Sequence, residues 1–317
     1  MTKYFLLFVF GLQILGCTLL SNQQEKEKPS TESIAPKASY SSDSNLMKES
    51  SGPKKRLMVL PFIDLKESRP VSLRESARNN FIKELNKTNY LIAIDSSDLK
   101  LDLTKFYSSG EYKLDDISKP VASMGVVAIL EGRIEDIRVK RTSDEVGVFR
   151  QLKTRFEAVV RVRMLSTRSA KELINTVKTV TLDEAQTRVA ENVSADRMLE
   201  TNPELINTLV TDAFLDFTPQ ITAAIDRLGW EGRIAMINGD RIFINVGKIS
   251  GVQVGDLLKV SDEGDDVYDP QTGRFIGKVQ GRLKGTLEGV SYFGQDGSIA
   301  IIHSGAGFKE NDRVELY

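Results

Sequence analysis

The chain has 317 residues, a hydrophobic content of 40% and a formal net charge of −1. A chain of this length can form about two domains with buried cores. Because the charge is nearly balanced and no basic, aromatic-rich module is present, we expect no nucleic-acid partner. The single cysteine excludes an intramolecular disulfide, and with the single histidine it excludes a metal cluster of Cys and His ligands.

The amino terminus has the pattern of a cleaved signal peptide, which we assign to residues 1–16. Lys3 precedes an almost unbroken apolar run over residues 4–15. This run is shorter than the roughly 20 residues that a membrane-spanning helix needs. Gly16 supplies the small residue expected before the cleavage point. The sequence therefore predicts an exported chain.

The residues around the predicted cleavage point, Ile14-Leu15-Gly16-Cys17, resemble the bacterial lipobox. This resemblance implies cleavage between Gly16 and Cys17, followed by acylation of Cys17, and several acyl chains are sufficient for stable anchoring in a bilayer. Thr18 follows in place of the Asp that retains lipoproteins in the inner membrane, which implies the outer membrane and a periplasm-facing chain. An ordinary cleaved secretory protein is the alternative.

Residues 17–53 are predicted to form the lipidated Cys17 and a disordered tether. The segment is polar, rich in Ser, Lys and Glu, and includes Pro29 and Pro36. It has too few large apolar residues to bury a core. As a flexible coil, it would let a folded domain extend on the order of tens of ångströms from the membrane.

Residues 54–228 have the pattern of an α/β layer. The apolar run 57–63 is typical of a buried strand, and Pro61 marks its end or a bulge. Ser72-Leu73-Arg74-Glu75 fits a capping box, which predicts a helix start at this point. Two further buried strands are expected at residues 90–94 and 126–130.

The period of the apolar residues changes to two in the segment 148–164. Its even positions are mostly apolar and its odd positions are often charged, as expected of a strand with one solvated face. Residues 173–182 are the expected antiparallel partner. Pro203 opens a helix whose apolar period is near 3.6 as far as Leu228, and Pro219 is expected to kink it.

Several short motifs of this region are similar to an α/β domain that the curli secretion channel (CsgG) family shares with the amino-terminal domain of TolB. The similarity covers residues 54–228 and implies binding instead of catalysis, although Val126 stands where such domains often carry Asp. The residues that carry it are Leu57-Met58-Val59-Leu60-Pro61-Phe62, the capped helix, Leu91-Ile92-Ala93-Ile94-Asp95 and Gly125-Val126-Val127-Ala128-Ile129-Leu130-Glu131-Gly132.

Curli-type channels insert β-hairpins into the outer membrane, so the same resemblance implies a second possibility, an oligomeric secretion pore that uses the hairpin 148–182. Such a strand needs about 9 to 11 residues with one lipid-facing side. Arg150 and Thr154 lie on the apolar face of the first strand, and no aromatic girdle is evident. These features favour an ordinary half-buried sheet.

Residues 229–317 are rich in Gly and in alternating β-forming residues, which predicts a second domain. Residues 233–237 and 241–246 form a hairpin around Asn238-Gly239, a favoured turn dipeptide. Residues 251–257 and 307–314 each form a turn that leads into a strand. The many short strands predict a small antiparallel β-barrel, SH3-like or OB-like in size. The fold class expected for the whole chain is therefore α+β.

The second domain is similar to the carboxy-terminal domain of the flagellar assembly protein T family, in which a TolB-like domain precedes such a barrel. This resemblance implies a role in building a ring around the flagellar motor, although a lipid anchor and tether replace that family's additional amino-terminal domain. The motifs are Asn245-Val246-Gly247, Gly251-Val252-Gln253-Val254-Gly255-Asp256, Asp269-Pro270-Gln271-Thr272-Gly273 and Gly305-Ala306-Gly307-Phe308.

No catalytic residue, cofactor or metal ion is expected. His303 lies beside Ser304, but neighbours on a strand point to opposite faces, which disfavours a Ser–His pair. The acidic segment 262–269 lacks the spacing of an EF-hand, so we expect a solvated hairpin tip instead of a calcium site.

The sequence as a whole predicts a non-enzymatic scaffold or assembly factor, anchored in the outer membrane through Cys17 and facing the periplasm. The expected partners are the lipid bilayer, other envelope proteins such as flagellar basal-body components, and a second copy of the chain in a homo-oligomer. The oligomeric pore and an enzyme with a deep polar cleft remain as alternatives.

Overall fold

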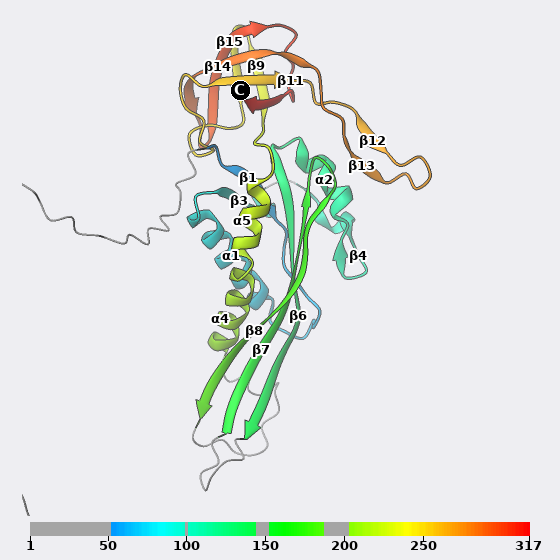
Figure 1. The fold of residues 1–317 in the computed structure, drawn as a ribbon, viewed down its shortest axis with the longest axis vertical. Helices are drawn as coiled ribbons and strands as arrows, with labels where there is room; N and C mark the ends of the chain where they lie inside the picture. The colour runs from blue at the N-terminus through cyan, green and yellow to red at the C-terminus, as the bar shows by residue number, and fades with distance from the viewer. Residues whose placement is uncertain (1–51, 99–100, 144–151, 187–202) are drawn as a thin grey trace, which may run out of the picture. The chain divides into compact units, whose positions relative to one another are not determined.

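The computed structural model describes residues 52–98, 101–143, 152–186 and 203–317, and it groups residues from Lys48 to Tyr317 into one compact unit. A mixed sheet with helices is followed in the chain by a closed antiparallel barrel (Figure 1). This architecture confirms the expected α+β class. The predicted domain boundaries, including the one between residues 228 and 229, stay predictions.

The sheet combines a parallel part with a long antiparallel part. Its strand order is β3-β1-β6-β7-β8, and the short strand β2 also pairs with β6. β1 is parallel to both β3 and β6, whereas β7 is antiparallel to both of its neighbours, β6 and β8. The strands are β1 (Lys55–Val59), β2 (Ile63–Asp64), β3 (Leu91–Asp95), β6 (Val126–Ser143), β7 (Leu152–Ser166) and β8 (Glu172–Gln186).

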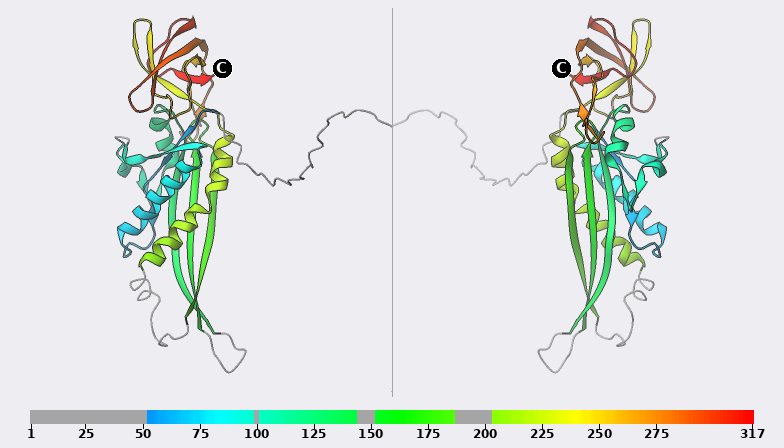
Figure 2. Two further views of the ribbon diagram at one scale, coloured as in Figure 1. Left: turned by 90° about the vertical axis from the view of Figure 1, so that its left-hand side faces the viewer. Right: turned by 90° about the vertical axis from the view of Figure 1, so that its right-hand side faces the viewer.

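Helices cover both faces of the sheet, as the buried parallel strands require (Figures 1 and 2). α1 (Val71–Lys87), α4 (Pro203–Leu215) and α5 (Thr218–Asp226) pack on one face. α2 (Leu114–Ala122) packs on the other face. Four smaller elements lie between β3 and α2 along the chain: η1 (Ser96–Asp98), η2 (Leu103–Phe106), β4 (Tyr107–Ser108) and β5 (Glu111–Tyr112).

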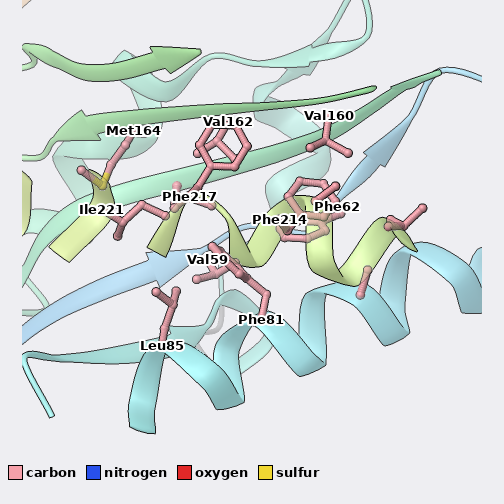
Figure 3. Packing of buried hydrophobic residues seen from close by; sticks show 14 of the residues in the cluster. Val59, Phe62, Phe81, Leu85, Val160, Val162, Met164, Phe214, Phe217 and Ile221 are labelled. Carbon is pink, nitrogen blue, oxygen red and sulfur yellow. The ribbon is translucent and has the colours of Figure 1, made fainter. Parts of the chain in front are cut away.

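The main core lies between the sheet and the first of these helical layers (Figure 3). Phe62, Phe81 and Phe214 form an aromatic cluster with ring centroids 4.2 to 6.1 Å apart. The even positions of β7 from Phe156 to Met164 face this core, which confirms the predicted alternation over this part of the strand. The fully buried members of that row are Phe156, Ala158, Val160, Val162 and Met164.

Two predicted helix features are wrong in detail. The capping box at Ser72 does not form, because α1 begins at Val71 after Pro70 and has no side-chain cap. The single helix predicted over residues 203–228, with a kink at Pro219, is instead two separate helices, α4 and α5. Pro219 lies in the first turn of α5, where its missing N–H leaves no hydrogen bond unmade, so a new helix starts there.

The six barrel strands close in the order β10-β15-β14-β11-β16-β9. The hairpin predicted near residue 238 is confirmed, but its two-residue turn is Gly239-Asp240, one position later than expected. Gly239 has φ +59°, which fits the first central position of a type II′ turn. The strands are β9 (Gly232–Asn238), β10 (Arg241–Ile244), β11 (Leu257–Ser261), β14 (Leu283–Phe293), β15 (Gly297–Gly305) and β16 (Arg313–Leu316).

A separate two-stranded ribbon interrupts the barrel sequence. It consists of β12 (Asp266–Tyr268) and β13 (Phe275–Lys278). The tip of this ribbon is the turn at residues 269–274, where Asp269 accepts hydrogen bonds from the backbone N–H groups of Gln271 and Thr272. The acidic segment 262–269, predicted as a hairpin tip, runs from the connection after β11 through β12, and only Asp269 lies at the tip.

Gly132 permits the closest contact between β6 and the aromatic cluster. A Cβ atom at this position would lie only 2.5 Å from the nearest atom of the Phe62 ring. Because Phe81 and Phe214 also pack against this ring, with centroids 5.9 and 4.2 Å away, the ring cannot move without disturbing the core.

Substitution of Gly132→Ala is therefore expected to lower the free energy of unfolding by about 1 to 3 kcal/mol through overpacking. Gly229→Ala is the matched control, because nothing lies within 4 Å of a Cβ there. Its effect should stay within about 0.5 kcal/mol. Urea denaturation of both variants measures the difference, and equal effects would contradict this description of the core.

Candidate functional surfaces

The barrel is filled by its own side chains. Trp230 and a set of aliphatic residues from the strands form one buried cluster inside it. Packing of this kind leaves the outer surface of the barrel as the part available to a partner. The aliphatic members are Ile234, Ile242, Ile244, Val246, Val252, Leu258, Val260, Leu287, Ala300 and Val314.

An apolar group of side chains lies on the outside of four neighbouring barrel strands, β9, β10, β15 and β14. Met236 of β9, Phe243 of β10 and Ile299 of β15 stand in register with one another. The rings of Phe243 and Phe293 contact edge to face, with centroids 5.3 Å apart. Ile301 continues the group along β15 and is 39% exposed, while Met236 is 44% exposed. We call these five residues the outer barrel patch.

The barrel is connected to the start of the sheet by a partly buried ion pair. Arg56 of β1 donates to Asp296 at 2.9 Å and to the backbone carbonyl of Asn245 at 2.6 Å. Asp296, in the loop between β14 and β15, also accepts from the N–H groups of Gly247 and Ser250, both at 3.0 Å, and from the Ser250 hydroxyl. We call Arg56 and Asp296 the clasp.

The electrostatics of the clasp stabilise the charged form of Asp296. Burial raises the pKa of this carboxyl, but hydrogen bonds from Ser250 and Arg56 outweigh that effect, so its pKa lies below the usual value. The clasp therefore stabilises the fold most where Asp296 is ionised.

A second set of contacts joins the barrel to the end of α2. Arg233 donates to the carbonyl of Ala122 at 3.1 Å, and Asn245 donates to that of Met124 at 3.3 Å. A cation suits the partial negative charge at a helix carboxyl end. Arg313 lies 2.9 Å from Glu231 beside these contacts, and its burial lowers its pKa to about 10.

The face of the sheet beside α2 carries an arginine cluster around Glu111 of β5. Arg133 approaches this carboxylate at 2.7 Å, and Arg161 and Arg163 approach it at 3.0 Å. Burial raises the pKa of Glu111, but the three cations lower it by more than burial raises it. The pKa of Glu111 therefore lies below the usual value. This cluster fixes the β4–β5 hairpin on the sheet.

The predicted lipidation residue Cys17 and the cleavage residue Gly16 lie outside the described residues. His303 and Ser304 were expected on opposite faces, yet both contact the Thr286 hydroxyl, at 3.0 and 2.8 Å. An irregularity in the β14–β15 pairing at Thr286 accounts for this. All three side chains lie at the surface of the barrel sheet, and the arrangement includes no carboxylate partner for His303.

The acidic segment 262–269 is engaged in ion pairs through Glu263 and Asp266. Asp266 lies 2.7 Å from Lys119 and 3.4 Å from Lys278, and Lys278 also pairs with Glu263. Across the described ranges, no group of three acidic or His side chains is placed to hold a metal ion. Within the same ranges, no helix combines the length and apolar composition needed to cross a bilayer.

No protein-family model and no curated protein matches the chain. Among solved structures, hypothetical protein CT253 from Chlamydia trachomatis shares 12% identity at a TM-score of 0.33, over 54% of this chain and 98% of that one. The PelC dodecamer of Paraburkholderia phytofirmans shares 13% identity at a TM-score of 0.30, and the match covers 54% of this chain and 88% of that one. Lipoprotein GNA1162 of Neisseria meningitidis shares 11% identity at a TM-score of 0.27, and the match covers 48% of this chain and 94% of that one. Likenesses at this level assign neither family nor function.

Loss of the clasp should destabilise the protein in a pH-dependent way. At neutral pH, Asp296→Asn is expected to lower the free energy of unfolding by about 1 to 3 kcal/mol, because Arg56 loses its charged partner. Since the folded pKa is lowered, this contribution is present above the unfolded pKa of about 3.9 and is lost as the pH falls through the folded value.

Denaturation of wild type and Asp296→Asn between pH 7 and pH 3 measures this dependence. The exposed residue Asp240 provides the control variant, Asp240→Asn. A difference between wild type and Asp296→Asn that does not shrink at acid pH would argue against the clasp.

Proposed function

We propose that this protein is an envelope lipoprotein that positions other proteins at the membrane and performs no catalysis. The outer barrel patch is the observation that carries this proposal. Contiguous apolar side chains on a protein surface, rimmed by polar residues, are typical of sites for protein partners. Aromatic residues and Met are enriched at the centres of such interfaces.

The connection between the barrel and the sheet suits a positioning role. The clasp and the Arg233 contact join the barrel to β1 and to the end of α2. A partner on the outer barrel patch would therefore be held in a defined orientation to the α/β layer. The predicted tether to an acylated Cys17 would allow the folded part to reach partners at some distance from the bilayer.

We place the protein in the outer membrane, facing the periplasm, on the basis of Thr18 after the lipobox. The resemblance of residues 229–317 to the flagellar assembly protein T family supports a flagellar basal-body ring, or a related envelope machine, as the assembly. A secretion pore built from β7 and β8 is less supported, because the apolar face of β7 is already covered by α4.

We expect lipid attachment to depend on the side chain of Cys17 alone. Cys17→Ser should abolish the incorporation of a clickable fatty acid into the chain and should block its lipid-dependent processing. The double variant Cys17→Ser, Ser21→Cys keeps one thiol in the tether and should also stay unlabelled. Labelling of either variant would show that the lipobox assignment is wrong.

Partner binding should depend on the outer barrel patch. Met236→Asp and Phe293→Asp are expected to reduce the recovery of cross-linked envelope partners at least tenfold, since burial of a charge at an interface centre is unfavourable. Val254→Asp is the control, because Val254 is an apolar residue outside the patch that is even more exposed, at 58%, than Met236 and Phe293.

Quantitative mass spectrometry of purified complexes measures this recovery, and the thermal unfolding midpoint of each variant confirms that it is folded. Partner recovery that is the same for the patch variants and the control would contradict the assignment of this surface.

A further inference from the structure

The parallel part of the sheet contains a crevice that the scaffold function does not use. The chain leaves β1 towards α1 on one face of the sheet, and it leaves β3 towards α2 on the opposite face. The carboxyl ends of these neighbouring strands are thus a topological switch point, the place where open α/β sheets bind ligands.

A cavity of about 550 Å³ lies at this point. One wall is α1, which contributes Arg74 and Arg78. The opposite wall is formed by η2 and the β4–β5 hairpin, which contribute Tyr107 and Tyr112. Phe62 adds an apolar surface between the walls. The volume falls in the range of sites for small molecules.

Arg78 is a cation held in place at the base of the crevice. It is only 8% exposed. Its guanidinium donates to the Val59 carbonyl at 3.0 Å and to the Ser96 hydroxyl at 3.3 Å, and it pairs with Asp95. Its Nε atom is buried and has no hydrogen-bond partner among the residues that the structure describes. A buried donor without a partner is unfavourable, so the protein contacts of this guanidinium leave part of its hydrogen-bonding capacity unused.

Arg74 lies one helical turn before Arg78 and is half-buried. Within the described part of the chain, neither a hydrogen bond nor an ion pair engages its guanidinium. The Tyr112 hydroxyl likewise makes no hydrogen bond to a described residue. Burial and the neighbouring Tyr107 and Glu131 raise the pKa of Tyr112, so its hydroxyl is a hydrogen-bond donor at neutral pH.

We propose that this crevice binds a small organic anion, with its phosphate or carboxylate group between Arg74, Arg78 and Tyr112. The apolar or aromatic body of the ligand would lie against Phe62 and Tyr107. A guanidinium and a phenol hydroxyl together favour an oxyanion, because charge-assisted hydrogen bonds are the stronger ones.

Acidic residues at the same crevice limit the class of ligand further. Glu67 and Glu75 also line it and are exposed, whereas Asp64 is paired with Arg69 at 2.9 Å. The two exposed carboxylates disfavour polyanions such as nucleic acids, because each added negative charge would be repelled. This binding is independent of the outer barrel patch, so the crevice and the scaffold function can fail separately.

Nuclear magnetic resonance titration of the full mature chain in detergent, with phenyl phosphate and with benzoate as probes, tests the proposal. Either probe should bind with a Kd below about 1 mM. Stronger binding of phenyl phosphate would identify the head group as a phosphate, and stronger binding of benzoate would identify it as a carboxylate. Inorganic phosphate, which lacks the apolar body, should bind at least tenfold more weakly than phenyl phosphate.

Arg74→Gln is expected to raise the Kd of the better probe about tenfold, and Tyr112→Phe should raise it severalfold. Arg227→Gln, at the exposed end of α5, is the matched control and should leave the Kd unchanged. Neither the Arg74 guanidinium nor the Tyr112 hydroxyl makes a hydrogen bond or an ion pair with a described residue. Both variants should therefore fold. Absence of saturable binding to both probes, or equal effects of Arg74→Gln and Arg227→Gln, would overturn the proposal.

Discussion

The arrangement of this protein depends on the clasp between Arg56 and Asp296. Arg56 belongs to the central parallel strand β1, while Asp296 holds the amide groups of Gly247 and Ser250 in a barrel loop. One carboxylate therefore shapes the barrel loops and connects them to the sheet. A partly buried pair with this many hydrogen bonds fixes geometry more than an exposed ion pair would, because water does not compete as strongly for either charge.

Two separate kinds of surface follow from this arrangement. The barrel has a filled interior, and its outside carries the outer barrel patch, which we propose contacts a protein partner. The sheet has a polar crevice at the ends of β1 and β3, lined by Arg74 and Arg78 and suited to a small anion. Both belong to the same compact unit, which the predicted tether would connect to a lipid anchor.

The sequence predicted those features that depend on local patterns. The alternation over β7 identified the buried row that includes Phe156 and Val160, because one face of that strand is packed and the other is solvated. Local patterns could not reveal the clasp, whose two residues are 240 positions apart. They also could not reveal that Arg78 reaches Asp95, since such pairs form only after the strands and helices have packed.

The most direct test of the proposed function is photo-cross-linking in living cells with a photoreactive phenylalanine analogue at position 243 of the full-length protein. The same analogue at position 254 serves as the reference. If the outer barrel patch positions a partner, position 243 will yield a discrete cross-linked envelope protein that is absent from position 254. Identical cross-link patterns at both positions, or none at position 243, would contradict the proposed scaffold function.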